Sequence, residues 1–249
     1  MRLDGKVAVV TGASSGIGRA IAIGCAREGA DLAITYRGND SGAEETAGAI
    51  RALGRRAEVL RTDVSRDADV AALAAAVRER FGRVDAWINN AGADILTGDG
   101  ARLTPREKLD LVLAVDVRGT VVASWAAAEL MGDRGGAIVN MSWDHVVLGM
   151  AGENPVLYAT AKGGVLSFSK SFARQVAPRV RVNILAPGFI ETGFGEQADS
   201  RWRREVEART PLGRWGTPED LVGAAVFLAS DESGFLTGQT IMVNGGVVM

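Results

Sequence analysis

Cysteine, histidine and tyrosine are scarce in this sequence of 249 residues, which has one, one and two of them. The single cysteine, Cys25, excludes an intrachain disulfide and a metal site built from several cysteines. Zinc and non-haem iron sites usually use several histidine or cysteine ligands, so the single histidine, His145, argues against both. We therefore expect no metal, and a Ser-His-Asp catalyst would have to use His145.

The sequence also lacks an excess of charge of either sign. It has 28 Lys and Arg against 30 Asp and Glu, a formal net charge of -2, which gives no basis for a nucleic-acid partner. Hydrophobic residues make up 47% of the chain but are spread out, and no uninterrupted apolar run reaches the roughly 18 residues of a membrane span. No signal-peptide pattern stands at the N-terminus. We therefore expect a cytoplasmic protein that binds neither nucleic acid nor membrane.

Short apolar segments alternate with helical patterns along the chain. The predicted strands are 6–10, 30–36, 56–63, 84–90, 135–142, 180–188 and 239–246. The predicted helices are 16–28, 41–53, 66–81, 104–131, 156–177 and 217–230. Continuous apolar strands between helices indicate a parallel sheet covered on both faces. The sequence thus predicts one α/β domain over 1–249, a doubly wound, Rossmann-type three-layer sandwich, with a substrate flap at about 189–210.

A glycine-rich turn, TGASSGIG at residues 11–18, follows the first predicted strand and opens the first predicted helix. Gly12 permits the tight turn, Gly16 lets backbone N–H groups approach a pyrophosphate, and Gly18 lets the helix pack close to the sheet. The helix N-terminus adds partial positive charge. A purely structural turn is the alternative, but this position favours a dinucleotide site. The cofactor-binding candidates in the turn are Gly12, Ser14, Ser15, Ile17 and Gly18.

The end of the second predicted strand bears on the choice of cofactor. An acidic residue there would bind the ribose 2′-hydroxyl of NAD. The sequence has Tyr36 and Arg37 instead, so no carboxylate repels a 2′-phosphate and an arginine is available to pair with it. This pattern favours NADP over NAD, and the alternative interpretation of Arg37 is a solvated loop arginine.

The segment YATAK places Tyr158 and Lys162 four residues apart on one face of a predicted helix. A phenol with a pKa near 10 is a poor acid–base catalyst at neutral pH. A nearby ammonium stabilises the phenolate and lowers that pKa, which suits proton exchange coupled to hydride transfer.

Together these motifs make the sequence resemble the classical short-chain dehydrogenase/reductase family over nearly the whole chain. Within the family, the C-terminal segments are most similar to 3-oxoacyl-carrier-protein reductases and sugar 1-dehydrogenases. Further segments carry the resemblance: Asp63-Val64, NNAG (89–92), VRVNILAPGFIET (180–192), PLGRWGTPED (211–220) and FLASDESGFLTGQTIMVNGG (227–246).

The resemblance implies an oxidoreductase that transfers a hydride between a nicotinamide cofactor and a carbonyl or secondary alcohol, with a 3-oxoacyl thioester as one candidate substrate. Arg37 makes NADP the expected cofactor. Tyr158 would exchange the proton, and Lys162 would lower its pKa and hold the ribose. The resemblance also implies a homotetramer built through the chain end and the helix at 156–177. The further implied cofactor contacts are Asp63 and Val64 at the adenine, Asn90, Ala91 and Gly92 in the cleft, and Pro187, Gly188, Ile190 and Thr192 on the nicotinamide side.

Asp116 is the first departure from the family pattern. Family members usually carry an asparagine in an N-x-x-G pattern, where it anchors a proton-relay water, and the matching segment here is VDVRGT (115–120). An aspartate has the same shape but lacks the amide donor and can carry charge. We expect Asp116 to act in the catalytic site, with either a retuned relay or altered proton delivery.

The second departure concerns the serine that usually ends the N-x-S-S pattern after the fifth strand. The stretch here is NMSWDHVV, so Trp143 takes that place by motif, whereas counting 13 residues back from Tyr158 reaches His145. Three interpretations stay open: Ser142 polarises the carbonyl, His145 is the donor, or the site lacks a third donor. We expect Trp143 to wall the substrate pocket or to pack under the loop.

These two departures also support a second hypothesis for the function. A catalytically weak, cofactor-binding member acting as a sensor or partner subunit would explain Asp116 and Trp143. The intact Tyr158 and Lys162 pair argues against it.

Overall fold

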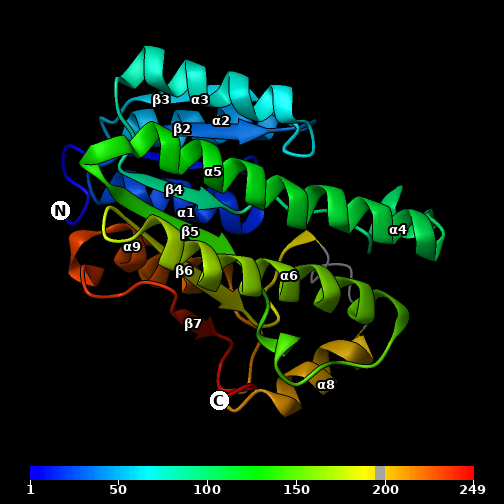
Figure 1. The fold of residues 1–249 in the computed structure, drawn as a ribbon. Helices are drawn as coiled ribbons and strands as arrows, with labels where there is room; N and C mark the ends of the chain where they lie inside the picture. Colours follow the sequence, from blue (N-terminus) through cyan, green and yellow to red (C-terminus); the bar gives the residue numbers. More distant parts are fainter. Residues whose placement is uncertain (194–199) are drawn as a thin grey trace.

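A computed structural model of the chain describes residues 1–193 and 200–249, and a parallel sheet of seven strands runs through its centre (Figure 1). The strand order is β3-β2-β1-β4-β5-β6-β7. The strands are β1 Val7–Val10, β2 Asp31–Tyr36, β3 Ala57–Arg61, β4 Ala86–Asn89, β5 Gly136–Met141, β6 Val180–Pro187 and β7 Thr240–Val243. Each predicted strand is present, slightly shorter than its apolar segment.

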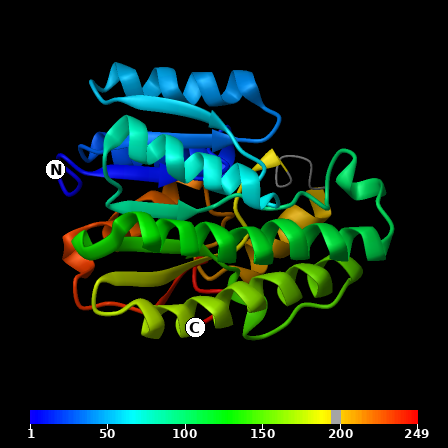
Figure 2. The same cartoon turned by 45° about the horizontal axis from the view of Figure 1, so that its top comes forward.

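Helices cover both faces of this sheet, as Figures 1 and 2 show. Apolar residues of α1 Gly16–Arg27, α2 Asp40–Ala52 and α9 Val222–Ala229 pack on one face. Those of α3 Asp67–Phe81, α5 Thr120–Met131 and α6 Glu153–Val176 pack on the other. Because alternate strand residues point to opposite faces, Val10 and Val9 belong to different clusters. The predicted doubly wound, three-layer architecture is confirmed.

The helix predicted over 104–131 is divided by a π-helical segment. Thr104 and Glu107 form a capping box at the start of α4 Pro105–Val112. The π-helical segment η2, Leu113–Gly119, follows and leads directly into α5. Such segments occur frequently at functional sites, because the extra residue per turn redirects the side chains that follow. Here it contains Asp116.

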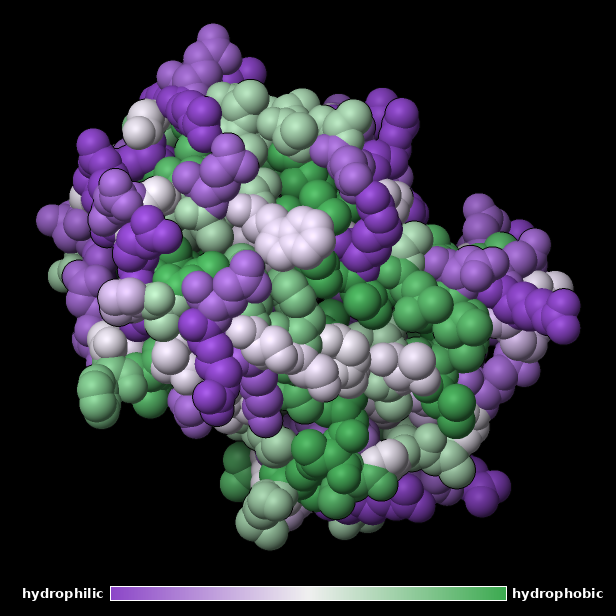
Figure 3. All heavy atoms as spheres, viewed as in Figure 1, coloured by the Kyte–Doolittle hydropathy of each residue, from purple (hydrophilic) through white to green (hydrophobic). Residues whose placement is uncertain are grey.

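The run from Pro105 to Arg134 is long and apolar enough, by length and composition alone, to cross a membrane. Its inner face nevertheless packs in the core beside α3 and α6, with Ala123, Ala127 and Met131 buried. This packing accounts for the apolar character of that face. Figure 3 shows apolar and neutral side chains gathered over α5 and α6, with charged side chains mostly around them.

Three elements differ from their sequence-based predictions. Helix α6 begins at Glu153, ahead of the predicted start at 156, because Gly152 at φ 128° reverses the chain just before it. The helix predicted at 217–230 opens as the 3-10 turn η5 Pro218–Leu221 before α9. In the predicted flap, α8 covers Ser200–Arg209, and residues 194–199 lie outside the described residues.

A buried polar network ties the central strands to the helices that carry the candidate site. The Trp87 indole N–H donates to Asn89 Oδ1 at 2.9 Å, and Asn89 Nδ2 donates to Asn140 Oδ1 at 2.8 Å and to Ser124 Oγ at 3.0 Å. Asn140 Nδ2 donates in turn to Ser169 Oγ at 2.9 Å. These bonds join β4 and β5 to α5 and α6, so they fix both helices against the sheet.

Candidate active site

The candidate residues meet at the edge of the sheet where the parallel strands end. The glycine turn follows β1, the NNAG segment follows β4, residues 142–145 follow β5, and residues 188–192 follow β6. The strand order reverses between β1 and β4, and open α/β sheets bind ligands at such a point.

Glycines are required in this turn because of close backbone contacts. Gly12 has φ 66°, and a Cβ there would lie 2.9 Å from Ala91 Cα. A Cβ on Gly18 would lie 2.2 Å from the Gly12 carbonyl oxygen and 2.4 Å from Asn90 Nδ2. Asn90 Nδ2 donates to the carbonyls of Thr11 and Gly12 at 3.0 and 3.1 Å. Asn90 therefore holds the turn in shape.

The N-terminus of α1 is arranged to accept an anion. Its N-cap residue, Ser15, makes no side-chain capping bond among the described residues, and the first turn holds no acidic residue. The first N–H groups of a helix lack partners within the helix, so they are free to bind an oxyanion. Ile17, the second residue of this helix, packs against the core beneath the turn.

Three arginines surround a hollow of about 360 Å³ at the ends of β2 and β3. It is lined by Arg37, Arg61, Asp63, Arg66, Asp69 and Ala72. Burial alone would raise the pKa of Asp63, but hydrogen bonds from Ser65 and the charges of Arg37 and Arg66 hold it below its usual value. Sequence reasoning found Arg37 but missed Arg61 and Arg66, because only the parallel pairing of β2 and β3 brings them together.

The residues beside this hollow continue the same edge. Tyr36 ends β2, and a hydrogen bond to Asp40 raises the pKa of its phenol. Val64 is buried against Gly119 of η2, where a Cβ would lie 2.9 Å from Val64 Cγ2.

Tyr158, Lys162 and Asp116 form a compact cluster between α6 and η2. The Lys162 ammonium lies 2.7 Å from Asp116 Oδ1 and 5.4 Å from the centre of the Tyr158 ring. Asp116 Oδ2 accepts a hydrogen bond from the Ala93 N–H at 2.9 Å. A Cβ on Gly92 would lie 3.2 Å from Asp116 Oδ1, so the NNAG segment packs directly on the ion pair.

Asp116 changes the electrostatics that the Tyr158 and Lys162 motif predicts. Burial raises the pKa of Tyr158 above its usual value; Lys162 opposes this rise and Asp116 adds to it. Burial would lower the pKa of Lys162, but Asp116 and Tyr158 hold it above its usual value. The expected lowering of the Tyr158 pKa by Lys162 is therefore outweighed, first by burial of the phenol and then by the charge of Asp116.

Ser142 is hydrogen-bonded to the backbone of α6 at Lys162. Its hydroxyl is buried and donates to the backbone carbonyl of Lys162 at 2.9 Å. A serine hydroxyl carries one proton, so this bond leaves none to donate to a substrate oxygen. In this arrangement Ser142 joins the loop after β5 to α6.

Trp143 contacts Tyr158 in the place where the sequence motif expects a serine. The ring centres lie 5.4 Å apart and the rings meet edge to face at 68°. Trp143 also stacks on His145, with ring centres 4.9 Å apart and an angle of 21° between the ring planes. His145 in turn meets Phe189 at 5.4 Å, so aromatic rings run continuously from the phenol to the segment after β6.

The imidazole of His145 is hydrogen-bonded to a buried carboxylate. Its Nδ1 lies 2.6 Å from Asp144 Oδ1, and Asp144 is completely buried. Asn244 Nδ2 donates to Asp144 Oδ2 at 3.2 Å. A Cβ on Gly188 would lie 2.8 Å from Asn244 Cβ and 3.2 Å from Asp144 Oδ2. Sequence reasoning missed Asp144 and Asn244, which lie 100 positions apart in the chain.

Known proteins match the whole chain. A family model described as "Enoyl-(Acyl carrier protein) reductase" covers residues 12–248. L-rhamnose 1-dehydrogenase (NAD(P)(+)) from Sphingomonas sp. strain SKA58 is 40% identical over 250 residues, which span 98% of this chain and 97% of the relative. The 3-oxoacyl-[acyl-carrier-protein] reductase FabG of Thermotoga maritima is 36% identical over 255 residues, which span 100% of both chains.

The chain belongs to the classical short-chain dehydrogenase/reductase family. Solved structures agree. A putative short-chain alcohol dehydrogenase from Sinorhizobium meliloti 1021 superposes with a TM-score of 0.90 at 34% identity, covering 98% of this chain and 97% of that one. A short-chain dehydrogenase/reductase from Serratia marcescens BCRC 10948 gives 0.91 at 32% identity and covers 100% of both. This family consists of oxidoreductases that use nicotinamide cofactors, and the predicted resemblance is confirmed.

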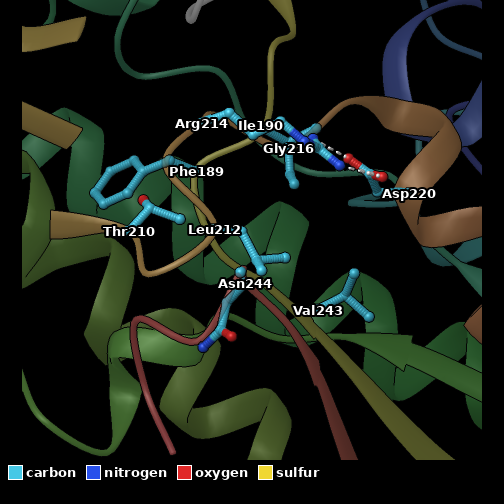
Figure 4. A pocket seen from close by; sticks show the side chains of 10 residues that line it. Phe189, Ile190, Thr210, Leu212, Arg214, Gly216, Asp220, Val243 and Asn244 are labelled. Atoms are coloured by element: carbon cyan, nitrogen blue, oxygen red, sulfur yellow. Dashed lines mark hydrogen bonds and ion pairs between the residues drawn. The ribbon is translucent and has the colours of Figure 1, made fainter. Parts of the chain in front are cut away.

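In this short-chain dehydrogenase/reductase, the segment after β6 faces both the glycine turn and a second hollow. A Cβ on Gly16 would lie 3.4 Å from Thr192 Cγ2, and Ile190 bridges to Gly216 after Pro187 ends β6. Beyond Phe189 lies a cavity of about 140 Å³, which Figure 4 shows with the Arg214 and Asp220 ion pair on its rim. Its lining is Phe189, Ile190, Thr210, Leu212, Arg214, Gly216, Asp220, Val243, Asn244 and Gly245.

Proposed function

We propose that this chain is an NADP(H)-dependent oxidoreductase that interconverts a carbonyl compound and a secondary alcohol. The observation that carries the proposal is the contact cluster of Tyr158, Lys162 and Asp116, which lies beside the glycine turn at the topological switch point. An ionisable phenol next to a fixed ammonium, at the edge where a dinucleotide binds, suits proton exchange coupled to hydride transfer.

Tyr158 is the proton-exchanging group. In reduction its hydroxyl donates a proton as negative charge develops on the substrate oxygen, and in oxidation the phenolate accepts that proton. Lys162 stabilises the phenolate and offers a donor to the ribose, while Asp116 fixes the ammonium at 2.7 Å and weakens its pull on the phenol. When bound, the nicotinamide cofactor supplies or accepts the hydride.

The glycine turn and the N-terminus of α1 fit a dinucleotide cofactor, since Ser15 makes no side-chain capping bond to the backbone N–H groups there among the described residues. The arginine-lined hollow supports NADP as that cofactor. Three arginines, Arg37, Arg61 and Arg66, outnumber the two carboxylates of Asp63 and Asp69 around this space, which leaves positive charge to bind a 2′-phosphate. Charge-assisted hydrogen bonds from arginine to phosphate would favour NADP over NAD, which lacks that phosphate.

The cofactor proposal is tested by titrating the protein with NADPH and NADH and following cofactor fluorescence. We expect tighter binding of NADPH, and Arg37→Ser and Arg61→Ser should each weaken NADPH binding about 10-fold while leaving NADH binding unchanged. Arg179→Ser is the control, because Arg179 pairs with Asp133 on the exposed surface away from the hollow. Tighter binding of NADH by the wild-type protein would contradict the assignment.

A 3-oxoacyl thioester is the substrate we propose. Two observations support it: relatives named as 3-oxoacyl-[acyl-carrier-protein] reductases and the apolar part of the cavity beyond Phe189, where Ile190, Leu212 and Val243 suit an acyl chain. Acetoacetyl-coenzyme A, simple ketones and L-rhamnose should be compared by the absorbance of the reduced cofactor. A higher kcat/KM for the sugar would overturn the thioester assignment and leave the reaction class intact.

Tyr158→Phe tests the reaction class itself. Removal of the phenolic hydroxyl should lower kcat by about 10²- to 10⁴-fold, with NADPH binding retained. Unchanged turnover would show that Tyr158 is not the proton-exchanging group.

We also propose that the protein assembles as a homotetramer. Trp125 on α5 and Val156 on α6 each expose 55% of their surface, and Phe235 and Met249 are fully exposed near the chain end. Light scattering coupled to gel filtration measures the assembly, and Trp125→Glu should reduce its mass. A monomeric wild-type protein would contradict the proposal.

A further inference from the structure

The charge that develops on the substrate oxygen is stabilised by each preorganised donor aimed at it, and Tyr158 provides one. Two polar neighbours of Tyr158 make hydrogen bonds to other groups. The single proton of Ser142 is donated to the Lys162 carbonyl at 2.9 Å. The Lys162 ammonium is held by Asp116 at 2.7 Å and by the Met141 carbonyl at 3.3 Å. The third N–H of Lys162 faces Tyr158 itself, and a further donor in contact with the phenol is the indole of Trp143.

The indole N–H of Trp143 has no hydrogen-bond partner among the residues that the structure describes, and its nitrogen still reaches solvent although the residue is only 8% exposed. Other buried tryptophans here are paired: Trp87 donates to Asn89 at 2.9 Å and Trp215 donates to the Arg203 carbonyl at 3.3 Å. The indole N–H of a mostly buried tryptophan usually finds a partner. The Trp143 N–H instead faces solvent beside the Tyr158 phenol, where it is open to a partner that arrives with the substrate.

We infer that the indole N–H of Trp143 is the second hydrogen-bond donor to the substrate oxygen, beside the hydroxyl of Tyr158. This inference rests on the proposed function, because it concerns the oxygen with which Tyr158 exchanges a proton. It replaces the open choice between Ser142 and His145 with a third residue, which is already in contact with the phenol.

The side chains behind Trp143 keep its ring in one orientation. His145 stacks on the indole at 4.9 Å, Asp144 holds the His145 Nδ1 at 2.6 Å, and Asn244 holds Asp144 at 3.2 Å. His145 and Asp144 are thus positioning residues, which act through Trp143. A rigid ring held by stacking keeps its donor in place without reorganisation during the reaction.

The first test compares two replacements of Trp143 that differ in their ability to donate. Trp143→Phe keeps an aromatic ring without an N–H and should lower kcat by about 10²-fold, with the KM for the carbonyl compound and the affinity for NADPH nearly unchanged. Trp143→His restores an N–H on a smaller ring and should recover part of that loss. A kcat for Trp143→Phe close to that of the wild type would overturn the inference.

The second test separates positioning by His145 from direct donation by His145. Both His145→Phe and His145→Ala remove the partner of Asp144, but only His145→Phe keeps a ring to stack on Trp143. We expect His145→Phe to stay within about 3-fold of wild-type kcat and His145→Ala to fall towards the Trp143→Phe value. Equal, large losses in both His145 variants, with a mild Trp143→Phe, would assign the donor to His145 instead.

A third measurement needs no substrate. The protein has five tryptophans, so ¹⁵N-labelled indole groups give few signals, and the one missing in Trp143→Phe identifies Trp143. Its N–H should exchange with solvent faster than that of Trp87, which is completely buried and paired with Asn89. Equal protection of the two would overturn the inference. A wild-type protein inactive on every compound would instead overturn the proposed function.

Discussion

Replacing Asp116 with asparagine should move the ionisation of Tyr158 to lower pH. The Asp116 carboxylate contributes to the raised pKa of the phenol, and it also neutralises the Lys162 ammonium that would lower this pKa. Asparagine has nearly the same shape but carries no charge. The variant therefore removes the repulsion between the Asp116 carboxylate and the phenolate, and it weakens the neutralisation of the Lys162 ammonium. Both changes favour the phenolate.

The structure sets the size of this shift. The spacing of Asp116 to Lys162 (2.7 Å) and of Lys162 to the Tyr158 ring (5.4 Å) places the carboxylate within about 8 Å of the ring centre. At that separation two unit charges interact by about 2 kcal/mol with an effective dielectric constant of about 20, and by less where water enters the cleft. Since 1.36 kcal/mol corresponds to one pKa unit, we expect the Tyr158 pKa to fall by about one unit.

The assay is the pH dependence of kcat/KM for alcohol oxidation, which reports ionisations of the free enzyme. Oxidation needs the phenolate, so its rate rises with pH through the Tyr158 pKa, and this rise should begin about one unit lower in Asp116→Asn. Asp67→Asn is the matched control, because it removes one carboxylate from an exposed ion pair with Arg118. An unchanged or upward-shifted profile in Asp116→Asn would refute the electrostatic reasoning.

Two further predictions concern the scaffold of the site. Asn140→Ala should lower the free energy of unfolding by about 2 to 4 kcal/mol, measured by urea denaturation, because the buried Asn89 and Ser169 side chains each lose one hydrogen bond. Gly18→Ala should weaken NADPH binding at least about 10-fold in a fluorescence titration, because its Cβ would lie 2.2 Å from the Gly12 carbonyl. Gly48→Ala in α2, where nothing lies within 4 Å of the added Cβ, should leave binding unchanged and stabilise the protein slightly.

The order of elements was predictable from the sequence because local patterns determine it. Apolar runs such as VAVV mark strands buried on both faces, and Thr104 with Pro105 marks the start of α4. The glycine turn could be placed because its spacing follows from backbone contacts, which the structure shows at Gly12 and Gly18. These features depend on residues that are close in sequence.

The contacts that set the chemistry could not be predicted in the same way. Whether Ser142 points to the phenol or to the Lys162 carbonyl depends on the fit between β5 and α6, and both orientations are compatible with the motif. The π-helical turn that brings Asp116 to Lys162 leaves no mark in the apolar pattern. Likewise, Asp144 meets Asn244 only after β5, β6 and β7 are assembled.

The two departures from the family pattern point in the same chemical direction. A Tyr158 whose pKa is raised stays protonated at neutral pH, and the indole N–H that we assign as its companion donates but never accepts a hydrogen bond. Both properties suit a carbonyl oxygen gaining charge, which is reduction. We therefore expect kcat for reduction to stay constant from pH 6 to pH 8, and kcat for oxidation to keep rising above that range.

Stopped-time assays with NADPH and a ketone, and with NADP⁺ and the corresponding alcohol, measure the two profiles. If reduction loses activity between pH 6 and pH 8, the group that donates the proton titrates near neutrality. An unperturbed histidine does so at about 6.5, whereas an unperturbed tyrosine does so near 10. That result would transfer the role of proton donor from Tyr158 to His145. The Asp144 carboxylate, which is hydrogen-bonded to the His145 ring, would then orient the proton donor directly.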